Sequence, residues 1–299
     1  MPYYLEKGDL VEKNVDGIVN ASNPRLIMVE GVSRAIFHKA GDKEMRAACL
    51  KIGQCPLGGA VLTPSFNMTN CKGIIHAVAP IYINGKHKEE KNLRSAYRKC
   101  FEIADAEGYQ SIAFPLLSGE FNYPLDEAYD VAESEILNYL STHRDHKVYM
   151  VVFKNYPNTL KDAVQESLTR YVLRNYVSVP NVITVSDNSK EAGKKIMEIA
   201  AKHGVELEEL IFKANFTSEE GKDLLDGAKD FDIHTACAFA MSAHATLDEF
   251  NEILAIAHFD AFNKNTISLV TSFFMKDGDY DIYKVNRALF YLGEHPLGL

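Results

Sequence analysis

Two amide side chains stand out by their position. Asn20 and Asn23 follow directly after the apolar run at residues 17–19. An amide both donates and accepts hydrogen bonds, which suits ribose hydroxyls or a phosphate. A buried strand ending in such a loop would present these groups at the carboxyl edge of an α/β sheet, where ligands bind. Asn is also common in ordinary turns, so the neighbouring motifs must decide between a binding loop and a plain turn.

The first half of the chain alternates between apolar runs and amphipathic segments. Strands are predicted at residues 3–5, 17–19, 60–63, 73–78, 111–117 and 147–153, and helices at residues 31–41, 42–52, 90–107, 126–140 and 160–177. Strands without polar alternation are buried on both faces. The pattern therefore predicts a three-layer α/β/α domain with a mixed, largely parallel sheet. Loops at residues 20–31, 80–85 and 118–124 would meet at its carboxyl edge.

The second half has a different character. Helices are predicted at residues 189–203, 206–214, 218–225, 233–243, 246–257, 265–276 and 282–292. Acidic and basic side chains balance over residues 1–180, so the whole net charge of −9 falls on residues 181–299. This shift predicts two domains, residues 1–178 and an all-helical domain at residues 179–299. An acidic helical domain argues against binding to a phosphate backbone.

Several classes of protein are disfavoured by composition. The chain has no run of apolar residues long enough for a membrane span and no signal-peptide pattern at its start, so a cytoplasmic protein is expected. Its five cysteines are an odd number and form no C-x-x-C pair, which predicts reduced thiols. No spacing of metal-ligating residues suggests a metal site, and no cofactor is expected.

Taken in order, the motifs of the first half resemble those of a known family. They are Gly8-Asp9-Leu10, the stretch from Val15 to Asn23, Gly31-Val32, the strand from Ile74 to Val78, the strand from Ser111 to Pro115, Gly119 and Tyr123-Pro124. Over roughly residues 1–175 the chain resembles the macrodomain family of the ADP-ribose-binding, Appr-1″-p processing type. This family binds ADP-ribose and related nucleotides. Many of its members hydrolyse ADP-ribosyl groups from proteins or deacetylate O-acetyl-ADP-ribose.

The resemblance implies a set of ligand-binding residues. Asp9 would accept a hydrogen bond from the adenine amine, beside the backbone of Leu10. Asn20 would support the loop, and Asn23 would face the distal ribose. The residues that would enclose the rest of the ligand are Gly31, Val32, Ser118, Gly119, Glu120, Phe121 and Phe153. Phe121 would form an aromatic wall. Phe153 would flank the adenine, although packing in the core explains it equally well.

The chain departs from the family pattern where catalysis would occur. Hydrolytic members carry glycines before Gly31, which let the backbone approach the ligand, whereas this chain has residues 27–30, Ile-Met-Val-Glu. Active relatives often place an Asp where this chain has Ser33, and a serine is no carboxylate base at neutral pH. Loss or change of catalysis is therefore expected. Asn23, Glu30 and Ser33 remain the weak catalytic candidates, and Glu30 or Glu120 is the alternative base.

The second half resembles a Cro-like helix-turn-helix fold. Its closest likeness is a bacterial C-terminal module whose tail pattern matches residues 277–286 and 296–298. In DNA-binding members the second helix of the motif enters the major groove and carries basic and amide residues. The corresponding residues 217–226 are acidic, and Gly221 weakens their helix. The resemblance thus indicates a degenerate motif that serves in protein interaction or self-association.

Three functions follow as hypotheses. The first is a reader that binds ADP-ribose, or an ADP-ribosylated protein, and reports it through the helical domain. The second is an ADP-ribosyl or O-acetyl-ADP-ribose hydrolase that works without the usual Asp. The third is a regulator that contacts nucleic acid through the helical domain. The altered loops favour the first over the second, and the acidic second half disfavours the third. No membrane partner is expected.

Overall fold

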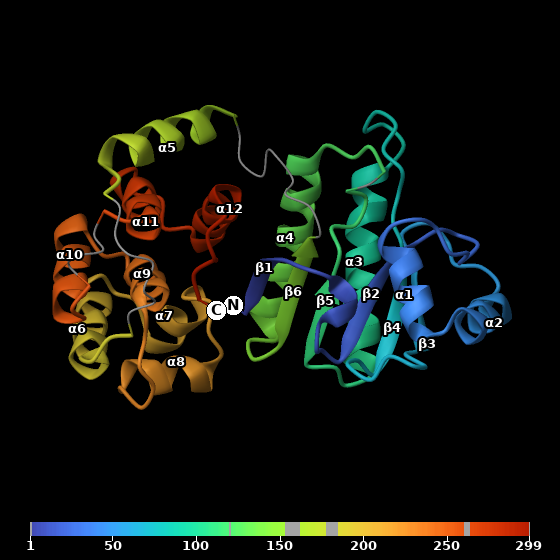
Figure 1. Ribbon diagram of the computed structural model, residues 1–299, viewed down its shortest axis with the longest axis horizontal. Helices are drawn as coiled ribbons and strands as arrows, with labels where there is room; N and C mark the ends of the chain where they lie inside the picture. Colours follow the sequence, from blue (N-terminus) through green and yellow to red (C-terminus); the bar gives the residue numbers. More distant parts are fainter. Residues whose placement is uncertain (1, 120, 153–161, 178–184, 260–263, 299) are drawn as a thin grey trace. The chain divides into compact units, whose positions relative to one another are not determined.

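The computed structural model describes residues 2–119, 121–152, 162–177, 185–259 and 264–298. The chain divides into two compact units, Tyr3–Tyr156 and Pro157–Leu299, the second together with Met1–Pro2. We call them the α/β unit and the helical unit (Figure 1). This division lies before helix α5 (Asp162–Asn175), which packs against α11 (Thr266–Lys276). The sequence predicted a domain boundary between residues 178 and 179, which is after α5. That boundary stays a prediction.

The strands of the α/β unit form one mixed sheet. Its members are β1 (Tyr3–Lys7), β2 (Gly17–Ser22), β3 (Ala60–Pro64), β4 (Gly73–Val78), β5 (Ser111–Phe114) and β6 (Lys147–Val152). Their order is β1-β6-β5-β2-β4-β3, and only the edge pair β3–β4 is antiparallel (Figure 1). The predicted fold class is confirmed. The parallel strands end at one edge, which makes that edge the expected place for a ligand.

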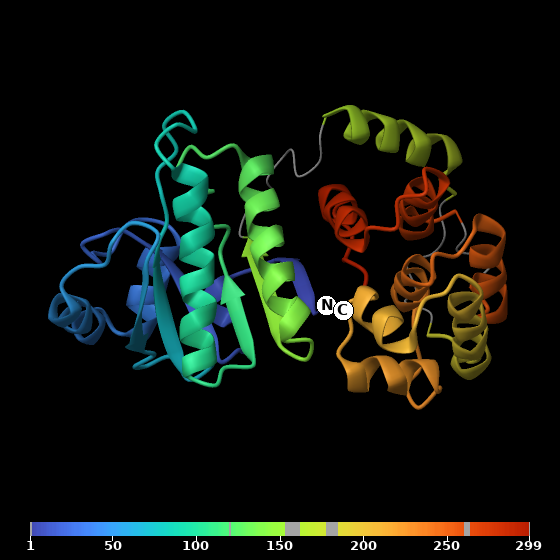
Figure 2. The ribbon, with the colours of Figure 1, turned by 180° about the vertical axis from the view of Figure 1, so that it is seen from behind.

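Helices cover both faces of this sheet. They are α1 (Val32–Ala40), α2 (Asp42–Ile52), α3 (Glu89–Ala106) and α4 (Leu125–Thr142). On one face, Ile18 and Ile74 share a buried cluster with Phe37 of α1. On the other, Phe114 of β5 packs against Tyr97 of α3, with ring centroids 5.3 Å apart. Figure 2 shows α3 and α4 on this second face. Every residue of β4 is buried, which explains its continuous apolar sequence.

The helical unit begins with α5 and contains α11. Its other helices in the described residues are α6 (Ser189–Lys202), α7 (Leu207–Lys213), α8 (Ser218–Leu225), α9 (Ile233–Ser242), α10 (Leu247–Ile256) and α12 (Ile282–Leu292). Two of its turns between helices have the same structure. Asn215 and His244 adopt positive φ after a helix, and Thr217 and Thr246 then start the next helix with a capping box. In the described ranges, none of the helices is both long and apolar enough to span a membrane.

Candidate functional site

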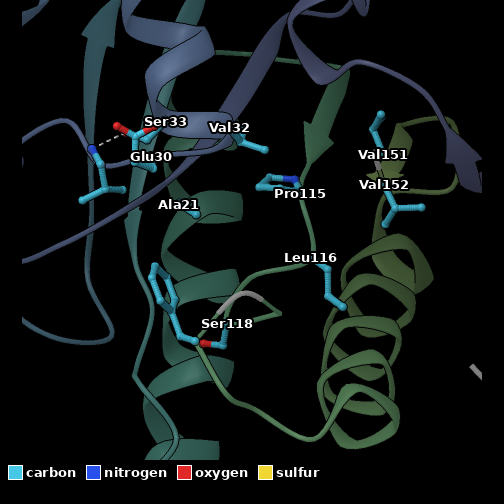
Figure 3. Close-up of a pocket in the computed structure, with 11 residues that line it drawn as sticks. Ala21, Glu30, Val32, Ser33, Pro115, Leu116, Ser118, Val151 and Val152 are labelled. Carbon is cyan, nitrogen blue, oxygen red and sulfur yellow. Dashed lines mark hydrogen bonds between the residues drawn. The ribbon is translucent and has the colours of Figure 1, made fainter. Parts of the chain in front are cut away.

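A pocket opens at the carboxyl edge of the sheet in the α/β unit. It is lined by Ala21, Val29, Glu30, Val32, Ser33, Pro115, Leu116, Ser118, Phe121, Val151 and Val152 (Figure 3). These residues come from the ends of β2 and β6, from the loop between β5 and α4, and from the loop before α1 and its first turn. Because parallel strands end at the same edge, segments far apart in the sequence meet here.

The first turn of α1 forms one side of the pocket. Gly31 is its N-cap, with φ 80° and no side chain to satisfy the exposed N–H groups that follow. Such groups at a helix start favour a phosphate. Ser33 is 2% exposed, and its Oγ accepts a hydrogen bond from Val29 N–H at 3.4 Å (Figure 3). In the described part of the chain, no hydrogen bond joins Ser33 to a carboxylate or imidazole that would activate it.

Glu30 is the ionisable side chain in the described pocket lining. Its carboxylate pairs with the Arg34 guanidinium, Nη1 to Oε2, at 3.0 Å. Arg34 Nε in turn donates to His38 Nε2 at 3.2 Å, and His38 Nδ1 lies 2.8 Å from Asp42 Oδ1. These side chains, spaced by four residues, run along the exposed side of α1. The candidate base thus lines the pocket, where it is paired with a cation in an exposed ion pair.

Asn23 uses its amide within its own loop. Its Nδ2 donates to Ile27 O at 2.7 Å, and its Oδ1 accepts from Arg25 N–H at 3.1 Å. This is the side-chain pattern of an Asx turn, and it fixes the path of residues 23–27. Asn23 does not belong to the pocket lining in the structure. Its implied contact with the distal ribose therefore stays a prediction.

Asn20 lies beneath the pocket rather than in it. It is fully buried, and its Nδ2 is 3.0 Å from Nδ1 of His76. The other ring nitrogen of His76 is 3.0 Å from Thr63 Oγ1. Burial lowers the pKa of His76 to about 4, so the ring is neutral at pH 7 and its Nδ1 accepts from Asn20. The network joins β2, β4 and β3 side by side.

Asp9 follows β1 and is not among the residues that line the pocket, so its implied contact with the adenine stays a prediction. Its exposed carboxylate accepts a hydrogen bond from Val11 N–H at 3.1 Å and caps the short 3₁₀ helix Leu10–Glu12. Leu10 is buried. Gly8 N–H donates to the carbonyl of Val152, a pocket residue, at 3.0 Å. Asp9 therefore follows a residue bonded to the end of β6, and among the described residues its second carboxylate oxygen makes no hydrogen bond.

The loop after β5 forms the opposite wall. Ser118 adopts φ 66°, and its buried hydroxyl donates to Pro80 O at 2.7 Å. Phe121 N–H donates to Ser118 O at 2.9 Å, and Gly119 N–H donates to Leu116 O at 3.2 Å. Ser118 and Phe121 both line the pocket, and their contact with a ligand stays a prediction. Glu120 and Phe153, two further predicted residues, lie outside the described residues.

Sequence reasoning missed the apolar part of the lining. Ala21, Val29, Pro115, Leu116, Val151 and Val152 were not among the predicted site residues. Apolar residues at strand ends look like core, and their position at the carboxyl edge is the signal that would have found them. No group of His, Cys, Asp or Glu in the described ranges is arranged to hold a metal ion. All five cysteines are buried free thiols.

Residues 19–132 match the family model described as Macro domain. Over 156 residues the chain is 36% identical to an O-acetyl-ADP-ribose deacetylase of Citrobacter koseri, which covers 50% of this chain and 87% of that protein. The chain belongs to the macrodomain family. A macro domain-containing protein of Caldanaerobacter subterraneus subsp. tengcongensis is 39% identical over 50% of this chain and 88% of its own length. A solved Oceanobacillus iheyensis macrodomain with ADP is 30% identical, covering 57% and 92% of the two chains with a TM-score of 0.46.

The matched residues of the macrodomain run from β2 to α4 and so lie within the α/β unit. They include the turn at Gly31 and the loop at Ser118 that form two walls of the pocket. The family match does not reach the helical unit, so its resemblance to a Cro-like fold stays a prediction.

Proposed function

We propose that this macrodomain binds ADP-ribose or a related nucleotide as a reader, with weak or no hydrolase activity. The observation that carries the proposal is that the polar side chains at the first turn of α1 already have partners within the protein. Ser33 lies there, buried and hydrogen-bonded to Val29 N–H, and the neighbouring Glu30 is paired with Arg34. The pocket thus offers N–H groups to a phosphate while its described residues offer no free base.

The proposed ligand spans the pocket from Asp9 to Phe121. The carboxylate of Asp9 accepts from the adenine amine. The diphosphate lies at the start of α1, next to Gly31 and Val32. The distal ribose lies against the wall made by Ser118 and Phe121. Relatives named O-acetyl-ADP-ribose deacetylase support this ligand class. An apolar cleft with a few fixed polar groups is also the usual form of a nucleotide site.

The runner-up function is an ADP-ribosyl or O-acetyl-ADP-ribose hydrolase that uses Glu30 or Glu120. Glu30 favours it in one respect, because the carboxylate lines the pocket. To act as a base, however, Glu30 would have to leave Arg34.

The test combines binding with turnover. The full chain is mixed with ADP-ribosylated protein and, separately, with O-acetyl-ADP-ribose, and released product is measured over time. We expect retention of the modified protein without release of ADP-ribose. Release at a rate that falls in Glu30→Gln would establish the hydrolase instead, and Glu44→Gln, a change on α2, is the matched control.

For the helical unit we propose a role in binding a protein partner or in self-association. The excess of acidic side chains in residues 181–299 supports this over contact with nucleic acid. The acidic stretch that would be the recognition helix, α8, supports it further. A reader needs such a second surface to pass on the bound state of its pocket.

A further inference from the structure

Glu89, the first residue of α3, has a carboxylate that is buried yet fully hydrogen-bonded. The side chain is 2% exposed. Its Oε1 accepts from the N–H groups of Ile83 and Asn84, each at 3.3 Å, and of Gly85 at 3.2 Å. Its Oε2 accepts from His87 N–H at 2.5 Å. One side chain therefore binds four backbone N–H groups in the second half of the loop between β4 and α3.

The charge of Glu89 suits this arrangement. Burial by itself would raise the pKa of the carboxyl, but the hydrogen bonds from the loop backbone lower that pKa to about 2. Glu89 is therefore ionised at neutral pH. A ring of backbone N–H groups around an anion is the arrangement called a nest, and here the anion is a side chain of the protein itself.

Burial of side chains does little to hold the same loop. Ile81 and Ile83 are 63% and 66% exposed, although both are large and apolar. Gly85 has φ 76°, a left-handed conformation that glycine adopts without steric strain because it has no side chain. The described restraints on residues 83–87 are therefore the four hydrogen bonds to Glu89, together with the contacts of Lys86 N–H and the His87 ring to Asn84 Oδ1.

The loop is also joined to the wall of the pocket. Pro80 O accepts the Ser118 hydroxyl at 2.7 Å, and Tyr82 N–H donates to Phe121 O at 3.0 Å. The rings of Tyr82 and Tyr123 pack with centroids 4.8 Å apart. Ser118 and Phe121 both line the pocket, and Ser118 is labelled in Figure 3. A shift of residues 80–83 would therefore move the pocket wall.

We propose that Glu89 is a positioning residue of the nucleotide pocket. It fixes residues 83–87 and, through the adjoining residues 80–82, holds Ser118 and Phe121 in place. This inference rests on the proposed binding of ADP-ribose. The chemical requirement is a group with two acceptor oxygens at this point. A carboxylate has them, whereas an amide has one acceptor and one donor.

The sharpest variant is Glu89→Gln, which keeps the size of the side chain. Its NH₂ group must face either the N–H of His87 or the three N–H groups bound by Oε1. The NH₂ group would then face backbone N–H donors of the loop. At least one hydrogen bond to the loop is therefore lost in either orientation of the amide. The matched control is Glu90→Gln. This neighbour is exposed and pairs with Arg94 along α3, so the same charge is removed without touching the loop.

Two measurements are made on the full chain: amide hydrogen exchange without ligand, and ADP-ribose affinity by calorimetry. In Glu89→Gln we expect faster exchange at residues 81–87 and 121–124 and an ADP-ribose Kd raised about tenfold. Glu90→Gln should match the parent in both. Exchange that rises evenly over the α/β unit, or stays unchanged at residues 121–124, would overturn the inference. So would an unchanged Kd.

Two further outcomes are separable. If the parent does not bind ADP-ribose, the proposed function fails, while the exchange measurement still decides whether Glu89 positions the wall. If Glu89→Gln does not fold, Ser118→Ala takes its place, because it removes the link to Pro80 from the other side. Faster exchange at residues 81–87 in Ser118→Ala supports the coupling of the two loops, and unchanged exchange there refutes it.

Discussion

At the start of α1, three neighbouring side chains set what the pocket can do. The Ser33 hydroxyl is held by Val29 N–H, and the Glu30 carboxylate is held by Arg34. The sequence predicted both departures from the family pattern, since residue types are visible in it. It did not predict that Asn23 turns back onto its own loop. That outcome depends on the backbone path of residues 23–27, which only the folded chain defines.

Replacing Ser33 with alanine should cost stability rather than catalysis. The change removes one hydrogen bond in a buried place, which is worth about 1 kcal/mol in the free energy of unfolding. We expect denaturant unfolding to show this loss, ADP-ribose affinity to change less than about threefold, and any residual hydrolysis to be unchanged. Hydrolysis in the parent that disappears in Ser33→Ala would mean that Ser33 is catalytic after all.

Replacing Glu30 with glutamine should improve binding. The change removes a negative charge from the pocket and frees Arg34 for the diphosphate. Because both side chains are exposed, we expect only about a threefold lower Kd for ADP-ribose, and a smaller gain at high salt. The control is Glu166→Gln in α5. It also breaks an ion pair with an arginine four residues later, but away from the pocket lining. Weaker binding in Glu30→Gln would show that this carboxylate contacts the ligand directly.

At the level of helices and strands, hydrophobic periodicity predicted the elements closely. The run predicted as a helix at residues 233–243 is α9, Ile233–Ser242, and the helix predicted from residue 246 is α10, which begins with a capping box at Thr246. The 3₁₀ turn at Leu10–Glu12 is too short to leave a pattern. The strand order and the antiparallel place of β3 depend on pairing between distant segments, which local patterns do not encode.

One buried network across the sheet has a pH signature. His76 of β4 joins Asn20 of β2 to Thr63 of β3, and its pKa is lowered to about 4 by burial. The unfolded chain takes up the proton near pH 6.5, whereas the folded chain does not. The contribution of neutral His76 to the free energy of unfolding is therefore fully present above pH 6.5. It falls by about 3 kcal/mol as the pH drops towards 4.

The check is denaturant unfolding at pH 7 and at pH 4.5. The parent should lose stability over this interval, and His76→Gln should be less stable at pH 7 but lose less on acidification. His38→Gln, at an exposed position on α1, should keep the full acid sensitivity of the parent. Equal acid sensitivity in the parent and in His76→Gln would refute the assignment to His76.

At the level of the whole chain, the two units divide the chemistry between them. The pocket belongs to the α/β unit, and the net charge of −9 belongs to residues 181–299. The shift in composition predicted two domains. The sequence alone did not show that α5 packs with the helical unit, because its apolar face fits a sheet or a helix equally well.

The acidic half yields a prediction about partners. The full chain should not retain duplex DNA on a gel, even at low salt, because binding to phosphates needs clustered basic side chains. The measurement is a mobility-shift titration at two salt concentrations, with a basic DNA-binding protein as the positive control. Retention at low salt that disappears at high salt would support the regulator hypothesis instead.

A calorimetric titration of ADP-ribose into the full chain and two Asp9 variants tests most directly whether the pocket binds this nucleotide. We predict saturable binding at one site, with Kd on the order of micromolar, and an affinity at least about tenfold lower in Asp9→Ala and Asp9→Asn. Asn keeps the oxygen that caps Val11 N–H, so loss of the cap would lower stability in Asp9→Ala alone. No binding by the parent, or equal binding by all three proteins, would contradict the proposal that this pocket holds ADP-ribose.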